Sequence, residues 1–489
     1  MVVGAGPVGL MLAGELRLGG ADVVLYDRLP APSGESRALG FTHRVAEVFD
    51  QRGLLSRLGE LRRGQQGHFG GVRIDLSGLP ESHHGVLGLS QARTEEMLAG
   101  WLAELGVPIR RGYAAVDLRE TADGVAVVFD GPDGRHEDTA GHLVGCDGGQ
   151  SAVRDLAGFA TSGQEATRGM YMADITGIEV RQRPIGERVP GGSMVLAVSL
   201  GDGYYRVLVH DAALRPPADA TPPPLAAVAD SWERLTGESL HGARARWTCA
   251  FGNAARLATE YRRGRVLLAG DAAHDLPPLA GWALSTGIQE AANLGWKLAA
   301  VATGRAPEGL LDTYHSERHP LGEQLLRNTL AASMLYLSGE EMEPLRNVLR
   351  ELVTYEDAAG HLAGMVSGLG VRYDMGPGEH PLLGRRLPPD LVLEPRDGER
   401  VRVAELLRTG RGLFVGTGGG DPRRLAGWAD RVDVVIGDWV GGEPHPHRAP
   451  GAALVRPDGH VAWAAPGGAD LEGALDRWFG PARAAARVA

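Results

Sequence analysis

The sequence has little cysteine, a single lysine and no long apolar run. Its 489 residues include only two cysteines, Cys146 and Cys249, which excludes a disulfide framework. Neither cysteine stands in a CxxC or zinc-ligand spacing, and Lys297 is the only lysine among many arginines. No stretch reaches the roughly 18 apolar residues of a transmembrane helix, and no basic segment precedes the first apolar run. We therefore expect a cytoplasmic protein that holds no metal and binds no membrane.

The charge balance also narrows the class of partner. The formal net charge is −11, which gives no reason to expect binding to nucleic acid or to an anionic membrane. Hydrophobic residues make up 43% of the chain and charged residues 23%, as in ordinary globular proteins. A chain of this length is expected to hold two or three domains. The expected partners are small molecules or a second copy of the chain, which makes the protein a monomer or a homodimer.

The start of the chain carries the most informative motif. An apolar run, the turn Gly-Ala-Gly-Pro-Val-Gly at residues 4–9, a segment of helical composition and a β-rich run follow one another. In such a strand, turn, helix and strand, Gly4 permits a tight turn, Gly6 lets the backbone approach a pyrophosphate, and Gly9 lets the helix pack closely on the strand. Asp27 ends the second strand at the spacing expected for a carboxylate that binds a ribose hydroxyl. The unit predicts a dinucleotide site.

Two further predicted strands end in acidic residues. Asp147 stands in Cys-Asp-Gly-Gly, where the carboxyl end of a sheet strand would meet a dinucleotide. Asp271 follows the buried strand predicted for residues 266–269, in Gly-Asp-Ala-Ala-His. His274 is tempting as a catalytic base, but a histidine in this position is more often structural, and we leave it out of catalysis. A long helix is predicted to start at residues 285–290. Its N-terminus, the positive end of the helix dipole, would point toward a ligand bound beyond Asp271.

Two other units follow from the pattern of the chain. Residues 169–256 form alternating, strand-like pieces, which we interpret as a β-sheet substrate domain inserted into the nucleotide-binding fold. Tyr171, Trp247 and Asn253 are candidates to line its cavity, although aromatic side chains on a sheet face are more often plain core. Residues 381–489 follow the order α, β, α, β, β, α of a thioredoxin-like fold. Without a CxxC this unit cannot carry out dithiol chemistry, so we expect a structural role or dimer contacts.

Three motifs in sequence order resemble those of a known family. They are the glycine-rich turn with Asp27, the Cys-Asp-Gly-Gly segment at 146–149 with Arg154, and the Gly-Asp-Ala-Ala-His segment at 270–274. With supporting stretches such as residues 361–368, they resemble the class A flavoprotein monooxygenases. Within that class the chain is similar to the FAD-dependent aromatic polyketide hydroxylases that act on angucycline and anthracycline intermediates. The resemblance covers nearly the whole chain.

The resemblance implies the architecture. We expect an α/β protein in which a Rossmann-like FAD-binding domain carries an inserted β-sheet substrate domain and is followed by a C-terminal thioredoxin-like domain. The FAD-binding domain is expected at residues 1–168 and 257–380, the substrate domain at 169–256 and the thioredoxin-like domain at 381–489.

The resemblance also implies the chemistry and the cofactor contacts. NADPH would reduce FAD, and the reduced flavin would activate oxygen to hydroxylate an electron-rich phenol, so no protein nucleophile is required. The expected substrate is a polycyclic aromatic polyketide intermediate of antibiotic biosynthesis. The protein would supply a dry pocket, an oriented substrate and a helix dipole. The residues expected to contact the cofactor are Gly4, Gly6, Gly9, Asp27, Arg28, Arg37, Gln91, Asp147, Asp271, Pro278, Gly281, Trp282 and Ser285.

The sequence departs from this family beside the flavin. Similar hydroxylases have Gly-Gly-Gln-Gly-x-Asn after the proline, whereas Pro278 is followed here by Leu-Ala-Gly-Trp-Ala-Leu-Ser at residues 279–285. Ala280 and Ala283 add methyl groups where backbone normally approaches the ring, and Trp282 replaces a glutamine and becomes a candidate substrate contact as well. Added bulk in a tight site commonly costs about 1–3 kcal/mol.

The sequence leaves three functional hypotheses, of which the second rests on this departure. In the first, the segment repacks locally and hydroxylation stays intact. In the second, the same scaffold performs altered chemistry, such as Baeyer–Villiger oxidation, ring rearrangement or flavin-independent dehydration. In the third, the chain is a non-catalytic partner of another tailoring enzyme.

Overall fold

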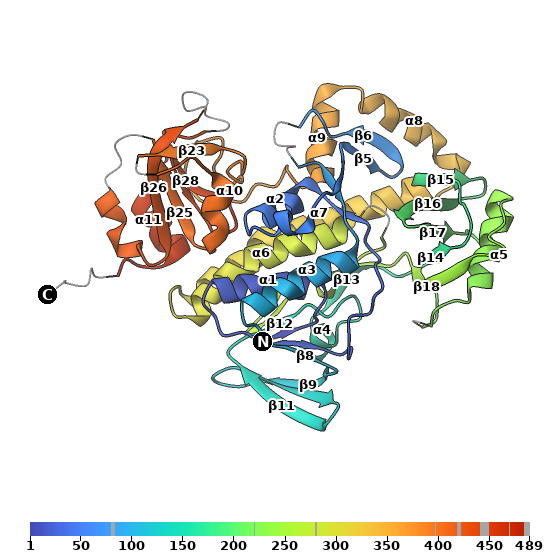
Figure 1. Ribbon diagram of the computed structural model, residues 1–489, viewed down its shortest axis with the longest axis horizontal. Helices are drawn as coiled ribbons and strands as arrows, with labels where there is room; N and C mark the ends of the chain where they lie inside the picture. Colours follow the sequence, from blue (N-terminus) through green and yellow to red (C-terminus); the bar gives the residue numbers. More distant parts are fainter. Residues whose placement is uncertain are drawn as a thin grey trace.

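The computed structural model has three visible parts: a central sheet with its helices, a second sheet beside it, and a C-terminal unit (Figure 1). The structure describes residues 1–79, 84–219, 221–278, 281–396, 398–417, 422–440, 449–468 and 470–483. Within these ranges no helix is long and apolar enough to cross a membrane. The domain boundaries at 168, 256 and 380 stay a prediction.

The opening strand, turn, helix and strand form as predicted. β1 (Val2–Val3) leads through the glycine turn into α1 (Pro7–Leu18), and β2 (Leu25–Asp27) follows. The six-stranded sheet is ordered β20 (Arg262–Arg263), β21 (Val266–Leu268), β12 (Leu143–Gly145), β1, β2 and β8 (Ile109–Arg111). All neighbours are parallel except β20 with β21. The carboxyl ends of β1, β12 and β21 therefore meet at one edge of the sheet.

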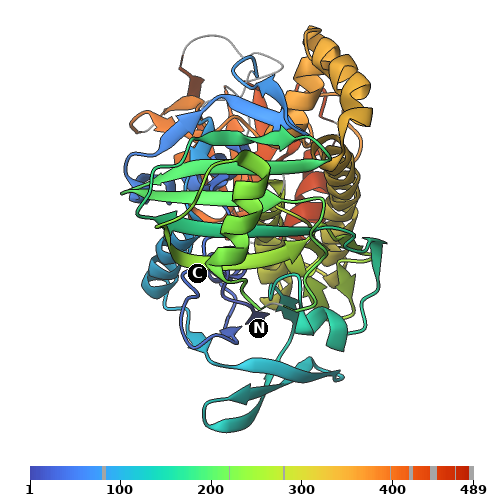
Figure 2. The same ribbon diagram turned by 90° about the vertical axis from the view of Figure 1, so that its right-hand side faces the viewer.

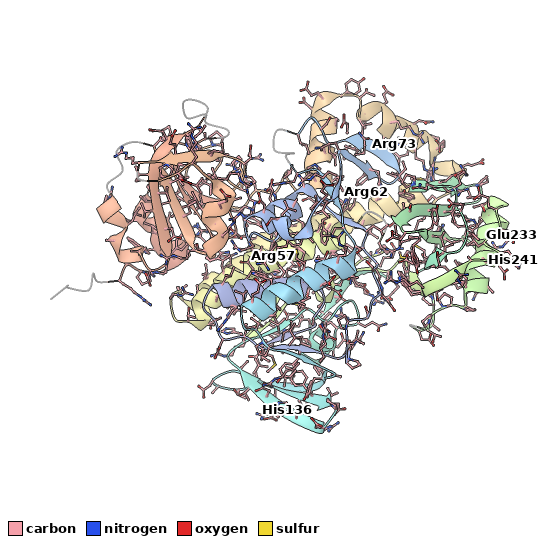
Figure 3. All side chains as sticks on the ribbon, in the orientation of Figure 1. Arg57, Arg62, Arg73, His136, Glu233 and His241 are labelled. Atoms are coloured by element: carbon pink, nitrogen blue, oxygen red, sulfur yellow. The ribbon has the colours of Figure 1, made fainter. Side chains whose placement is uncertain are left out.

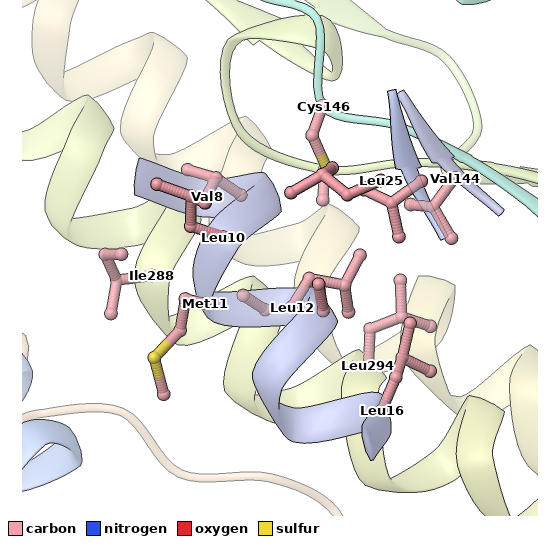
Figure 4. Close-up of a cluster of buried hydrophobic side chains, with 14 of the residues drawn as sticks. Val8, Leu10, Met11, Leu12, Leu16, Leu25, Val144, Cys146, Ile288 and Leu294 are labelled. Atoms are coloured by element: carbon pink, nitrogen blue, oxygen red, sulfur yellow. The ribbon is translucent and has the colours of Figure 1, made fainter. Parts of the chain in front are cut away.

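Helix α1 is buried between this sheet and α6 (Trp282–Ala302). Figure 4 shows Leu12 and Leu16 of α1 in one cluster with Leu25 of the sheet and Leu294 of α6. These side chains are at most 3% exposed, and burying a leucine contributes about 1.5–3 kcal/mol to stability. This packing fixes the helix start of α1 relative to the sheet edge.

Short elements surround the central sheet. The helices are α2 (His43–Asp50), α3 (Gln91–Glu104) and α4 (Ala152–Leu156). Three small antiparallel sheets lie among them. The first contains β9 (Ala114–Glu120), β10 (Val125–Gly131) and β11 (Gly134–Ala140), and the second contains β3 (Gly40–Phe41), β7 (Val86–Gly88) and β4 (Arg62–Gly64). The third contains β13 (Thr161–Gln164), β19 (Ala255–Ala258) and β22 (His274–Asp275). A further hairpin joins β5 (Gln66–Phe69) to β6 (Val72–Asp75).

The second large sheet is antiparallel, as expected for the strand-like pieces of this region. Its order is β15 (Arg183–Val189), β16 (Ser193–Gly201), β17 (Tyr204–His210), β14 (Gly169–Thr176) and β18 (Arg244–Gly252). Helix α5 (Leu225–Thr236) lies across its outer face, which Figure 2 turns toward the viewer. The opposite face packs on the end of α7 (Asp312–Leu337).

Helix α6 begins three residues earlier than predicted. Gly281 precedes it with φ +69°, a left-handed conformation that glycine adopts without strain, so the helix starts at Trp282. Ser285 and Thr286 consequently lie inside the first turns rather than ahead of the helix. Helices α7, α8 (Glu343–Leu352) and α9 (Glu356–Ser367) then follow.

The C-terminal unit has a six-stranded sheet of its own. The order is β24 (Val401–Arg402), β23 (Val392–Pro395), β26 (Val432–Trp439), β25 (Gly412–Gly416), β27 (Ala452–Val455) and β28 (Val461–Ala465), with α10 (Val403–Leu406) and α11 (Leu471–Phe479). β25 and β26 are parallel and the other neighbours are antiparallel. Both cysteines of the chain, Cys146 and Cys249, lie outside this unit.

Candidate active site

Each glycine of the opening turn has the geometry that its predicted role requires. Gly4 has φ +106°, and a Cβ there would lie 2.3 Å from the carbonyl oxygen of Cys146. A Cβ on Gly9 would lie 1.9 Å from the carbonyl oxygen of Gly4, so only glycine lets the helix come this close. A Cβ on Gly6 would meet no atom within 4 Å. Gly6 is therefore the position at which a ligand can approach the backbone.

The start of α1 offers donors to a negatively charged ligand. Gly6 is the N-cap residue, no side chain caps the helix, and Pro7 has no N–H. The N–H of Leu10 bonds to the carbonyl of Gly6 at 3.0 Å, so the N–H groups of Val8 and Gly9 have no intrahelical acceptor. Together with the helix dipole, these groups form an anion site.

Asp27 holds the turn from the end of β2. Its Oδ2 accepts from the N–H of Ala5 at 2.6 Å and its Oδ1 accepts from the N–H of Leu29 at 2.8 Å. Each carboxylate oxygen keeps a second lone pair, so the carboxylate can also accept from a ribose hydroxyl beside the turn. Arg28, the next residue, is exposed.

Arg37 lies where the opening unit meets the second large sheet. Its guanidinium is 65% exposed and lies 3.5 Å from Glu35, and its carbonyl oxygen accepts from Nη1 of Arg206 at 2.7 Å. Gln91 begins α3, and its Nε2 donates to Oε1 of Glu95 at 2.9 Å.

The two acidic residues at the ends of neighbouring strands differ in their surroundings. The carboxylate of Asp147 accepts from the hydroxyl of Ser151 and, at 3.1 Å, from the N–H of Val153. It therefore stabilises the start of α4, and burial raises its pKa. Asp271 follows β21 with an exposed side chain, so its carboxylate is accessible to a ligand at the sheet edge.

The segment that departs from the family pattern is partly described. Leu279 and Ala280 lie outside the described residues; Pro278 and Gly281 are exposed. The indole of Trp282 stacks on Phe69 of β5 with ring centroids 5.8 Å apart and an interplanar angle of 27°. It packs with apolar side chains of β6, α7 and α9. Trp282 is therefore accommodated by a cluster formed by the hairpin and two helices.

Ser285 and Ala283 lie in the first turn of α6. Ser285 is buried, and its Oγ accepts from the N–H of Thr42 at 3.2 Å. Ala283 is half-buried. The hydroxyl of Ser285 thus joins the start of α6 to the loop before α2.

The face of the second sheet that meets Arg37 carries residues that the sequence analysis missed. Arg206 is 1% exposed and donates to both carboxylate oxygens of Asp174, at 2.7 and 2.8 Å. Its guanidinium also lies over the ring of Trp247, 5.1 Å from the centroid. A lone arginine inside the apolar run of β17 was the available sequence signal.

The three substrate contacts predicted in residues 169–256 do not share one surface. Trp247 pairs across β14 with Asp174, whereas Tyr171 is three residues away along β14 and packs on the α5 side. Successive side chains of a strand alternate between faces, so Tyr171 and Trp247 lie on opposite faces of the sheet, and their contact with a substrate stays a prediction. The Oδ1 of Asn253 accepts from the N–H groups of Thr167 and Arg168, at 2.8 and 2.9 Å, and so holds the entry to β14.

The parallel sheet and the glycine turn define a dinucleotide-binding α/β protein with an added antiparallel sheet. Residues 1–329 match the model of the FAD binding domain family, and residues 380–482 match that of the C-terminal domain of aromatic-ring hydroxylases. The chain belongs to the family of FAD-binding aromatic-ring hydroxylases, which are FAD-dependent monooxygenases.

Similar proteins cover the chain from end to end. The 12-dehydrotetracycline 5-monooxygenase/anhydrotetracycline 6-monooxygenase of Streptomyces rimosus subsp. rimosus is 41% identical over 98% of both chains. The crystal structure of CabE, an aromatic hydroxylase from angucycline biosynthesis, is 50% identical over 99% of both chains, with a TM-score of 0.94. BexE, studied for oxidation during BE-7585A biosynthesis, is 53% identical over 99% of both chains, with a TM-score of 0.93. The dialkyldecalin synthase of Streptomyces rugosporus is 38% identical over 99% of both chains.

The residues at the glycine turn fit FAD. Gly6 leaves open space, Val8 and Gly9 present N–H groups, and Asp27 stands at the end of β2. When bound, the flavin supplies the oxygen chemistry. The protein has to bind and orient the substrate and to exclude water from the site. The prediction of an FAD-binding aromatic-ring hydroxylase is confirmed.

Proposed function

We propose that the chain hydroxylates a polycyclic aromatic polyketide during antibiotic biosynthesis, with FAD as its cofactor and NADPH as its reductant. The observation that carries this proposal is the end-to-end similarity to hydroxylases of angucycline and tetracycline biosynthesis, on a chain that keeps an open glycine turn. We also propose that it acts in the cytoplasm as a monomer or homodimer.

The contacts support a division of roles among the proposed site residues. The N–H groups at the start of α1 bind the pyrophosphate beside Gly6, and Asp27 binds the ribose. Ser285 and the start of α6 face the flavin ring, where the helix dipole stabilises negative charge. Trp247, held by Arg206, forms a wall for the aromatic substrate. The remaining proposed cofactor contacts are Gly4, Gly9, Arg28, Arg37, Gln91, Asp147, Asp271, Pro278, Gly281 and Trp282.

An absorbance spectrum of the purified protein tests the cofactor, and NADPH oxidation tests the reaction. We expect bound oxidised flavin near 1 mol per mol, and NADPH oxidation that a polycyclic phenol stimulates and that yields a hydroxylated product. Use of NADH at the same rate would remove the NADPH assignment alone. A colourless protein that takes up no added FAD would overturn the proposal.

Altered chemistry on the same scaffold is the second candidate. Trp282 stands where similar hydroxylases have glutamine, and the similarity to a dialkyldecalin synthase shows that not every similar protein is named as a hydroxylase. The double variant W282Q/A283G separates the candidates. Its hydroxylation rate should rise if the segment suppresses hydroxylation, and should stay unchanged or fall if the wild type already hydroxylates. Substrate-stimulated NADPH oxidation by the isolated protein would exclude a non-catalytic partner.

A further inference from the structure

Helix α8 carries a row of exposed apolar side chains at the outer edge of the molecule (Figure 1). Leu345 is 52% exposed, Val348 51% and Leu352 46%, and Tyr355, in the turn after the helix, is 59% exposed. Spacings of three and four residues place the first three side chains on one face of α8. Single exposed apolar residues are ordinary, whereas a row of them is typical of a surface that contacts another molecule. We call these four residues the α8 row.

The other side of α8 is already packed. Leu349 and Val353 pack with side chains of β6, α7 and α9. Arg346 is buried, and its guanidinium donates to three backbone carbonyls at the end of α7 and in the turn that follows, at 2.7 to 2.8 Å. A surface helix needs one apolar face to join the core. Because α8 has that face and is held in place by Arg346, the α8 row is additional to what the fold requires.

Carboxylates border the α8 row along the chain. Glu340 precedes the helix, Glu351 lies on it three residues after Val348, and Glu356 and Asp357 follow it. All four acidic side chains are exposed, and none of them forms an ion pair with a described residue. The surface around the α8 row is therefore negatively charged at both ends and beside its middle.

The arginines on and beside α8 do not neutralise these carboxylates. Arg188, Arg346 and Arg350 all pair with Glu343, at 3.1, 3.2 and 2.8 Å. At 3.6 residues per turn, Glu343 and Arg350 lie about 140–160° around the helix from Leu345, on the side away from the α8 row. The cationic groups thus occupy one flank of α8, and the acidic residues border the α8 row.

Charge distinguishes between the possible occupants of this surface. In a two-fold, antiparallel contact between copies, Glu340 of one copy would approach Glu356 of the other, and like charges that face each other are unfavourable. An anionic membrane surface would be repelled in the same way. A cationic segment is attracted instead. The helical spacing of the α8 row matches the apolar face of another helix, which would place lysine or arginine beside the carboxylates.

We infer that the α8 row docks a cationic amphipathic helix of another protein. The apolar face of that helix covers the α8 row, and its lysine or arginine side chains pair with Glu351 and Glu356. None of the four residues of the α8 row is among the proposed cofactor or substrate contacts. The inference therefore goes beyond the proposed function and does not depend on it.

Fluorescence anisotropy of a labelled helical peptide made of leucine and lysine tests the inference on the full chain. The peptide carries its leucines on one helix face, and the matched peptide has the same composition with the leucines spread around the helix. We expect the first peptide to bind with a Kd about tenfold lower, because only it presents a continuous apolar face. L352Q should raise that Kd by roughly tenfold. L200Q, the same change at a leucine of β16 that is 39% exposed, should leave it unchanged.

A second pair of variants tests the charges. E351Q should raise the Kd of the amphipathic peptide about twofold to fivefold, because it removes one exposed ion pair with a lysine. E233Q is the matched control, since Glu233 lies on α5 at the right-hand edge of Figure 3 and its side chain is exposed there. It should leave the Kd unchanged.

Equal binding of the two peptides, absence of binding, or a Kd that L352Q leaves unchanged would overturn the inference. A dimer of the free protein that L352Q dissociates, measured by analytical ultracentrifugation, would make the α8 row a contact between copies. Binding to phosphatidylcholine vesicles that L352Q abolishes would make it a membrane contact, and either result also overturns the inference. Leu352 and Leu200 are both exposed, so both variants should keep the Tm and the flavin absorbance of wild type. Failure of the proposed function is therefore distinguishable from failure of this surface.

Discussion

Nε2 of His274 lies 3.0 Å from Oε2 of Glu290, and both side chains are fully buried. Glu290 also accepts from the N–H of Gly270 at 2.8 Å, so this pair joins α6 to the strand end that carries Asp271. Burial by itself lowers the pKa of His274, but the Glu290 carboxylate outweighs burial and raises it. The contacts of His274 thus link α6 to the end of β21, and its exclusion from catalysis stays a prediction.

E290Q should destabilise the protein by about 3–5 kcal/mol at pH 6, because it leaves a buried histidine without its carboxylate. The folded-state pKa of His274 is raised, so the stabilisation is fully present below about pH 6.5 and is lost as the pH rises through the folded-state pKa. Urea unfolding of wild type and E290Q between pH 6 and pH 9 measures how the free energy of unfolding depends on pH. Wild type should lose more stability over that range than E290Q, and parallel curves would contradict the ion pair.

Alanine substitutions at Gly6 and Gly9 should separate cofactor binding from folding. G9A forces Cβ against the carbonyl of Gly4 and should destabilise the chain by about 1–3 kcal/mol, seen as a lower Tm. G6A adds a methyl group to open space, so its Tm without flavin should match wild type. The same methyl group blocks a pyrophosphate, and FAD titration should show an affinity about tenfold lower or worse. Normal FAD affinity in G6A would place the cofactor elsewhere.

Glu317 should govern part of the acid stability, because it joins the C-terminal unit to α6. It accepts from Arg456 at 2.6 Å and from Lys297 at 2.8 Å. Burial by itself would raise the pKa of Glu317, but Arg456 and Lys297 outweigh burial and lower it to about 2. The resulting stabilisation, about 3 kcal/mol, is present above about pH 4.5 and is lost as the pH falls toward 2.

Urea unfolding at pH 7, 4 and 3 checks this assignment with E317Q. The variant should be less stable than wild type at pH 7 and should lose less stability on acidification. E308Q is the control, since Glu308 is 52% exposed and its surface pairs contribute little. Similar acid profiles for wild type and E317Q would argue against the buried network.

Arg206 should affect substrate binding through the position of Trp247 and the Arg37 segment. Lysine cannot bond to both oxygens of Asp174 and to the carbonyl of Arg37 together, so R206K should raise the KM for a polycyclic phenol by about tenfold. Y171F changes the opposite face of the same sheet and should leave the KM unchanged. Steady-state kinetics on both variants checks this, and an equal effect of the two would contradict the assignment of faces.

Local patterns were sufficient to predict the opening unit and the family. The spacing of Gly4, Gly6 and Gly9 depends on contacts within one turn and one helix, so its geometry follows from neighbouring residues. The start of α6 was predicted too late because Gly281 adopts a left-handed conformation that composition alone does not reveal.

Amino-acid order alone determined the strand, turn and helix at Gly4–Gly9, the absence of a CxxC, and the motif order that marks the hydroxylase family. Only the tertiary structure decided that Trp282 packs on Phe69, that Trp247 and Tyr171 face opposite ways, and that His274 pairs with Glu290. The physical reason is the separation along the sequence between the residues that interact. Turn and cap geometry arises between residues a few positions apart, whereas a side chain's partner across a sheet or between helices depends on how distant segments pack.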